Sequence, residues 1–80
     1  MVVLRLFAAA RSAAGTARDT VAGSTVGEVL DAAVERYGRE FEAVLPTCAV
    51  WVDGRPATRE TPVPEGAEVG VLPPVSGGAS

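Results

Sequence analysis

The chain starts with an apolar run, Val-Val-Leu-Arg-Leu-Phe at 2–7, in which Arg5 is the one polar residue. This run, rich in branched and aromatic side chains, predicts a strand. In an extended segment Val2, Leu4 and Leu6 share one face, and the intervening positions, Phe7 included, share the other. The alanine-rich stretch 8–14 has high helix propensity, and Gly15 after it is a typical C-terminal stop, so a short helix is expected there.

The clearest helical pattern lies between Thr25 and Gly38. Thr25 and Glu28 have the spacing of a capping box, in which the hydroxyl and the carboxylate satisfy free backbone N–H groups at a helix start. Apolar residues then recur on one helical face as far as Gly38: Val26, Val29, Leu30, Ala33, Val34 and Tyr37. This amphipathic helix needs a sheet or another helix to cover its apolar side.

The remaining elements are shorter. The patterns predict a weak strand at 16–22, one or two helical turns at 39–45 ended by Pro46, a strand at 48–52 with a tight Asp53-Gly54 turn, a short strand and loop at 55–65, and a last strand at 67–72. One helix and several strands in so short a chain can bury the helix face only against a single curved mixed sheet. The fold class is therefore α+β, a roll over 1–73 in which one mixed sheet packs against one main helix.

The amino-acid composition excludes several classes of function. The 80 residues include seven Arg, no Lys, no His and one Cys against ten Asp plus Glu, a formal net charge of −3. Without His, Lys or a Cys pair, most catalytic and metal-binding groups are missing, so the chain is not expected to be a catalyst alone or to hold a metal. The acidic balance and the scattered arginines also argue against nucleic-acid binding.

Targeting features are weak. The apolar run at 2–10 is broken by Arg5 and lacks the basic lead of a signal peptide, and it is far shorter than the roughly 18 residues of a membrane span. The sequence therefore predicts a cytoplasmic protein that does not enter the membrane, with Cys48 as a reduced thiol.

The C-terminal segment 74–80 departs from the pattern of the domain. Pro73 and Pro74 favour an extended path, and only small residues follow Val75. Glycine lacks the Cβ that would clash with the walls of a narrow channel. From Pro74 to Gly78 such a tail reaches about 16 Å at roughly 3.3 Å per residue, enough to carry a carboxylate into a site on another protein. The alternative is a frayed end whose glycines have no function.

The ending Leu-Pro-Pro-Val-Ser-Gly-Gly at 72–78 resembles the terminus of the small, sulfur-carrying subunit of molybdopterin synthase, a ubiquitin-like β-grasp protein. Residues 6–15 are similar to the first strand and helix of that family, and residues 25–30 are similar to another of its segments.

This resemblance implies a sulfur carrier in molybdenum cofactor biosynthesis. Gly78 would be adenylated by a ubiquitin-activating-type enzyme with ATP, converted to a thiocarboxylate with the help of a sulfurtransferase, and inserted into the large synthase subunit. No cofactor would be bound to the chain itself. Gly77, Ser76, Val75 and Pro74 would lie in the channel of the partner, and Phe7 and Leu72 would form an apolar docking patch unless they pack in the core.

One feature departs from the family, because Ala79 and Ser80 follow the glycine pair. A protease removes them, or they are left from an expression vector, or the chain is not a working carrier. Two other functions stay open. A carrier for thiamine, cysteine or thio-metabolite synthesis shares the fold and the glycine pair, and a ubiquitin-like modifier would join its end to lysines of target proteins.

Other chemical groups are assigned to packing or solvent. Cys48, alone in an apolar strand, is expected to be a small buried hydrophobe, and Trp51 to pack on the sheet. Glu28, Asp31 and Glu35 are expected on a solvated helix face rather than in a cation site.

Overall fold

Five strands form one mixed sheet in the order β2-β1-β5-β3-β4 in the computed structural model, which describes residues 1–73. β1 is parallel to β5 and antiparallel to β2, and β3 is antiparallel to both β5 and β4. Along the chain the elements are β1 (Val2–Leu6), α1 (Ala8–Ala14), β2 (Arg18–Val21), α2 (Val26–Tyr37), α3 (Arg39–Val44), the 3-10 turn η1 (Leu45–Thr47), β3 (Ala49–Val52), β4 (Arg55–Pro56) and β5 (Glu68–Leu72).

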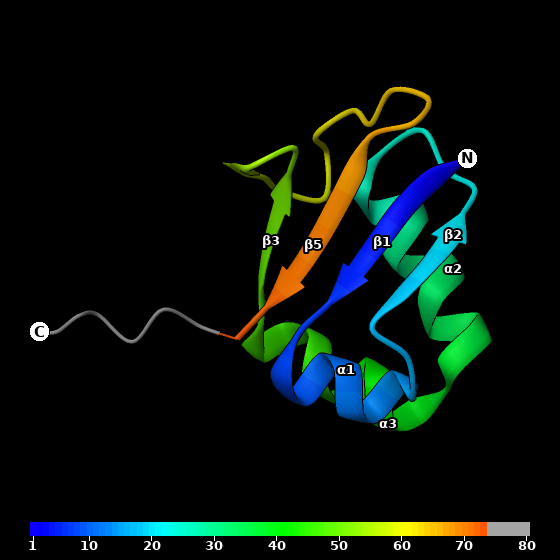
Figure 1. Cartoon of the computed structure of the whole chain (residues 1–80), viewed down its shortest axis with the longest axis vertical. Coiled ribbons are helices and arrows are strands. Elements are labelled where there is room, and N and C mark those ends of the chain that lie inside the picture. Colours follow the sequence, from blue (N-terminus) through cyan, green and yellow to red (C-terminus); the bar gives the residue numbers. More distant parts are fainter. Residues whose placement is uncertain (74–80) are drawn as a thin grey trace, which may run out of the picture.

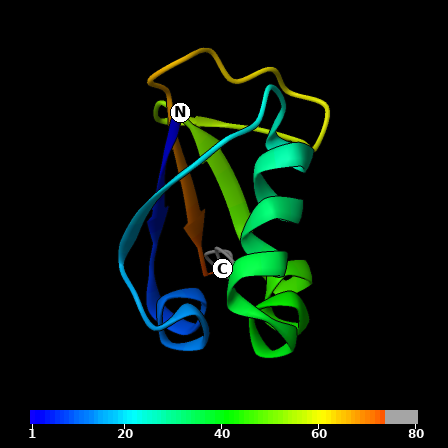
Figure 2. The same cartoon turned by 90° about the vertical axis from the view of Figure 1, so that its right-hand side faces the viewer.

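The predicted fold class is confirmed. α2 lies across one face of the sheet, and α1 and α3 lie at the end where β1 and β5 finish (Figures 1 and 2). The opposite face of the sheet has no helix over it in the described part of the chain (Figure 2). This is the β-grasp arrangement of one mixed sheet holding one main helix.

The core lies between the sheet and α2. Alternate residues of β1 and β5 are fully buried, as the sequence pattern of both strands predicts. They meet the apolar face of α2, and Phe41 of α3 closes the end of the core. The buried set is Val2, Leu4, Leu6, Ala10, Val21, Val26, Val29, Leu30, Ala33, Phe41, Val63, Ala67, Val69 and Val71.

The start of α2 is fixed from two sides. Thr25 Oγ1 accepts the N–H of Glu28 at 3.2 Å, as the capping box predicts, whereas the Glu28 carboxylate accepts the N–H of Ser24 at 2.7 Å. The carbonyl of Arg59 accepts the Gly27 N–H at 2.8 Å. A Cβ at position 27 would lie 3.2 Å from that carbonyl oxygen, so glycine permits the close approach. The 57–66 loop therefore covers the helix end.

The Asp53-Gly54 turn has the predicted form. Both residues have positive φ, 48° and 84°, as a two-residue type I′ hairpin requires. Pro46, expected to end the 39–45 helical turns, instead lies inside η1, because proline is tolerated in the first turn of a helix.

Candidate functional site

The end of β5 is the place where the chain leaves the sheet. Leu72, its last residue, pairs with Ala49 of β3, and Pro73 is the last described residue. Pro74, Val75, Ser76, Gly77 and Gly78, together with Ala79 and Ser80, lie outside the described residues. Their predicted roles in a partner channel and as a thiocarboxylate stay predictions.

Phe7 and Leu72, the predicted docking residues, are brought together by the register of the sheet. Val69 and Val71 point into the core, so Gly70 and Leu72 face the opposite side. A Cβ placed on Gly70 would lie 3.7 Å from Leu72 Cδ1 and 4.0 Å from Phe7 Cε2. Both side chains therefore converge over the bare backbone of Gly70, on the face that α2 does not cover.

Phe7 is held in this position by its own backbone. Its N–H donates to the Val71 carbonyl at 3.1 Å, and its carbonyl accepts the Ala10 N–H at 3.1 Å at the start of α1. Ala8, with a positive φ of 52°, turns the chain from β1 into α1. Phe7 remains 38% exposed, so core packing does not account for it.

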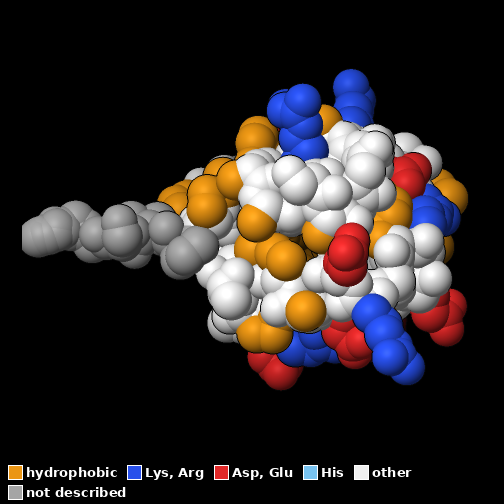
Figure 3. All heavy atoms as spheres, turned by 90° about the horizontal axis from the view of Figure 1, so that it is seen from below, with side chains coloured by type: hydrophobic (Ala, Val, Ile, Leu, Met, Phe, Trp, Pro, Cys, Tyr) orange, Lys and Arg blue, Asp and Glu red, His pale blue; other side chains and the backbone are white. Residues whose placement is uncertain are grey.

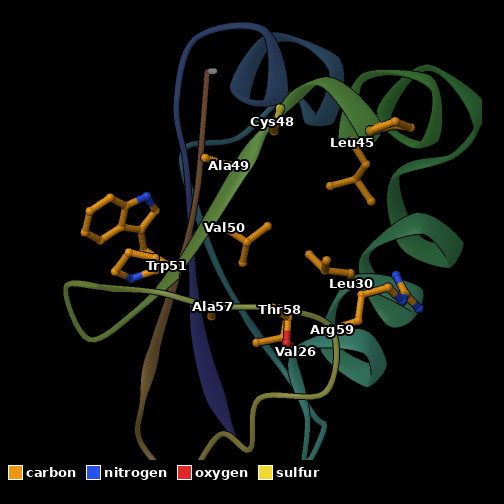
Figure 4. Close-up of a pocket in the computed structure, with 12 residues that line it drawn as sticks. Val26, Leu30, Leu45, Cys48, Ala49, Val50, Trp51, Ala57, Thr58 and Arg59 are labelled. Atoms are coloured by element: carbon orange, nitrogen blue, oxygen red, sulfur yellow. The ribbon is translucent and has the colours of Figure 1, made fainter. Parts of the chain in front are cut away.

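Two further apolar residues extend this surface, and the sequence did not assign them to it. Trp51 pairs with Gly70, and Ala49 pairs with Leu72, so both lie on the same face of the sheet. Val50 and Trp51 project to opposite sides of β3, and only Val50 points toward α2 (Figure 4). Phe7, Ala49, Trp51 and Leu72 are called the outer-face patch below. The pairing of Trp51 with a glycine could have indicated its place on this surface, but the pairing depends on a strand register that sequence alone does not provide.

Arginine borders the outer-face patch. The Arg5 guanidinium lies 5.7 Å from the centroid of the Phe7 ring, and its Nη1 is 2.7 Å from Glu68 Oε2. Arg18 is the cross-strand neighbour of Arg5 on β2. Seen from the end where β1 and β5 finish, exposed hydrophobic side chains are flanked by charged ones (Figure 3). A partner with an apolar centre and acidic edges would match this surface.

A groove of about 630 Å³ lies between β3, α2 and the 56–59 segment (Figure 4), and its lining includes Ala49 and Trp51 of the outer-face patch. Cys48 lines it, only partly buried, with its thiol 3.4 Å from the Val44 carbonyl oxygen. Cys48 packs against the core, as expected of a small hydrophobe, but it is only partly buried because it also borders this groove. Arg59 borders the groove and pairs with Asp31 at 2.8 Å.

Residues 1–73 contain neither a candidate metal site nor a candidate membrane-spanning helix. They contain no group of three His, Cys, Asp or Glu side chains placed to hold a metal ion. None of their helices combines the length and apolar character that crossing a membrane requires.

Comparison with known proteins gives a consistent picture. The model of the ThiS family matches residues 4–78. SAMP1 from Haloferax volcanii is 31% identical, with 96% of this chain and 98% of that chain covered and a TM-score of 0.78. The small archaeal modifier protein 1 of Methanosarcina acetivorans is 28% identical, with 96% and 95% covered and a TM-score of 0.85.

A third structure shares the fold at lower identity. It is the complex of subunits 1 and 2 of molybdopterin-converting factor from Helicobacter pylori, matched at 23% identity over 96% of this chain and 97% of that chain, with a TM-score of 0.69. No curated protein matches this chain in sequence.

Proposed function

This chain belongs to the ThiS family and is a ubiquitin-like protein of the sulfur-carrier or modifier type, and we propose that it is the sulfur-carrying small subunit of a molybdopterin synthase. Its terminal glycine carboxylate, at Gly78, would receive sulfur and deliver it to the large subunit. The outer-face patch would hold that partner while the tail enters its active site.

The observation that carries this proposal is the position of the outer-face patch beside the end of β5. Leu72 is the last strand residue and Phe7 contacts the same face, so a partner seated on this patch also meets the chain where it continues into Pro-Val-Ser-Gly-Gly. An exposed apolar surface on a small domain often marks a partner site. The Helicobacter pylori protein of this fold is in a complex with a second subunit, and we extend that arrangement to this chain.

The chemistry fits a chain without His or Lys. A free carboxylate is a poor electrophile, so an activating enzyme first joins it to the AMP part of ATP and releases pyrophosphate. A persulfide of a sulfurtransferase then attacks the mixed anhydride and displaces AMP, which gives an acyl disulfide. A second thiol reduces that disulfide by forming a disulfide with the sulfurtransferase cysteine, and the thiocarboxylate is released. The bases and cations for both steps come from the partner enzymes, and this chain contributes only the group that is modified.

Ala79 and Ser80 have to be removed before activation. With them in place, the carboxyl group of Gly78 is in a peptide bond to Ala79 and is not free to be activated. We propose that a protease cleaves after Gly78 and that only the shortened chain is adenylated.

Intact-mass spectrometry of the protein isolated from its own cells tests this function. We expect a chain that ends at Gly78 and that carries the mass increase of one oxygen replaced by sulfur. An unmodified chain that always ends at Ser80 would contradict the proposal.

Deletion of residues 77–80 provides the functional test. Sulfur transfer to the large subunit should be lost, while the unfolding midpoint should stay that of the full chain, because these residues follow the last strand. Loss of the cooperative unfolding transition would instead assign a structural role to the deleted end.

A second candidate is a ubiquitin-like protein modifier. It is favoured by the 31% identity to SAMP1 and by the similarity to the Methanosarcina acetivorans protein, whose name calls it a modifier. In that case, pull-downs would find Gly78 joined to lysines of other proteins. Since the chain has no lysine of its own, chains linked through lysine would not form. Thiocarboxylate without such conjugates would favour the carrier.

A further inference from the structure

The free edge of β2 is capped by side chains. β2 is the outermost strand on one side of the sheet and pairs only with β1 among the described strands. The Ala17 carbonyl, just before β2, points toward β1, since it accepts the N–H of Leu6 at 2.9 Å. Backbone groups alternate in direction along an antiparallel strand, so those of Arg18 and Thr20 point away from the sheet. An edge of this kind is a template for another strand.

All four of these outward groups already have partners. Thr16 Oγ1 accepts the Arg18 N–H at 3.3 Å and donates to the Arg18 carbonyl at 3.0 Å. Asp19 Oδ1 accepts the Thr20 N–H at 2.8 Å, and Arg36 Nη1 donates to the Thr20 carbonyl at 2.9 Å. Within Arg18–Val21, both outward N–H donors are therefore used, and both outward carbonyls already accept a hydrogen bond.

Asp19, which caps the edge, is also hydrogen-bonded to two residues of α2. Arg36 Nη1 also lies 2.9 Å from Asp19 Oδ2, and the Tyr37 hydroxyl donates to the same oxygen at 2.6 Å. These hydrogen bonds, first from Tyr37 and then from Arg36, lower the pKa of Asp19 to about 2. Burial, and then the bond to Asp19, raise the pKa of Tyr37 to about 12. The network is thus charged and hydrogen-bonded throughout the neutral range.

We propose that Thr16, Asp19 and Arg36 form an edge lock that keeps β2 from pairing with β2 of a second copy of this chain. The second copy is the occupant that the geometry favours. An antiparallel pair about a two-fold axis at Asp19 places Arg18 opposite Thr20 of the other copy, so that the four outward groups of each chain satisfy one another. The same axis brings the two Asp19 carboxylates together, and their charges add to the barrier.

The opposite edge of the sheet does not need such a lock. β4 has two residues and is joined to β3 by the tight Asp53-Gly54 turn, and Pro56 lacks an N–H. Short edge strands and proline are both recognised means of preventing strand addition. A carrier whose working surface is the uncovered sheet face gains from edges that do not self-associate.

The test is the oligomeric state of an edge-opened full-length variant, Thr16→Val/Asp19→Asn/Arg36→Met. This variant frees both Arg18 groups and the Thr20 carbonyl and removes the charge at position 19, while the new side-chain amide oxygen can still accept the Tyr37 hydroxyl to support folding. Light scattering after size exclusion, over a concentration series reaching the millimolar range, should show its mass rising toward that of a dimer. The wild-type chain should remain a monomer. A further Thr20→Pro substitution removes the N–H at the edge and should restore the monomer.

Asp31→Asn/Arg59→Met is the matched control, because it removes an exposed Asp–Arg pair that joins α2 to the 57–66 loop, away from β2. It should stay monomeric. The proposal is overturned if the edge-opened variant is folded, by circular dichroism, and monomeric at every concentration, or if Thr20→Pro leaves its dimer intact. Should the edge-opened variant unfold, Thr16→Val alone provides the test, through the hydrogen-exchange rate of the Arg18 amide. Faster exchange of the Arg18 amide supports the lock, and unchanged exchange contradicts it.

Discussion

Asp19 provides the sharpest test of the electrostatics, through Asp19→Asn. The folded protein holds the pKa of this carboxyl at about 2, compared with 3.8 for an unperturbed one. That difference corresponds to about 2 kcal/mol of stability. Because 29% of the side chain remains exposed, screening by water reduces the expected loss to about 1 kcal/mol.

The lowered pKa determines the pH range in which Asp19 stabilises the fold. A carboxyl with a lowered pKa stabilises the fold fully above its unfolded pKa of 3.8 and loses that effect as the pH falls through about 2. Asp19→Asn should therefore cost about 1 kcal/mol near neutral pH, or about 4–8 °C in melting temperature. The difference from wild type should shrink toward zero below the folded pKa.

Urea denaturation of both proteins across this pH range measures the effect, and the other carboxyl groups cancel in the difference. A loss that is equal at neutral and at strongly acidic pH would refute the reasoning, since the charge of Asp19 would then not be its origin. Tyr37→Phe is the companion variant. It removes the hydroxyl that contributes most to the lowered pKa, so the Asp19 pKa measured by NMR should rise.

Two further variants separate the core from the docking surface. Phe41→Ala removes a fully buried ring that packs edge-on against Tyr37, with the two ring centroids 5.2 Å apart. It should lower the free energy of unfolding, measured by urea denaturation, by about 3–5 kcal/mol. A loss below about 1 kcal/mol would contradict the assigned packing. Phe7→Ala should change stability by less than about 1 kcal/mol but weaken binding to the large synthase subunit about tenfold or more. Calorimetric titration measures that binding, with Val44→Ala, outside the outer-face patch, as control, and equal affinities for the two variants would remove Phe7 from the interface.

Much of the fold could be predicted because the strongest patterns are local. The run of branched residues in β1 and the capping residues of α2 each determine one element from neighbouring residues, and the structure agrees with both. β3 was harder, because Ala49–Val52 is apolar at every position and does not reveal which side faces the helix. Trp51 was therefore expected only to pack on the sheet, and its pairing with Gly70 adds that it does so on the uncovered face.

The edge lock could not be predicted for a related reason. Asp19 and Arg36 are 17 residues apart, on a weak strand and at the end of a helix, and no sequence pattern links them. Their contact depends on how α2 crosses the sheet. The partial exposure of Cys48 could not be predicted either, since it depends on the groove beside β3 rather than on its apolar neighbours in sequence.

The central place of β5 has a consequence for how the protein is made. β5 lies between β1 and β3, and Val3 pairs with Glu68, 65 positions later in the chain. The sheet cannot close until the last strand has been synthesised, and contacts so distant in sequence form late and slowly. A chain cut short before β5 would lack its central strand and expose its core. An activating enzyme that binds only the complete sheet would therefore not consume ATP on a chain that ends before β5.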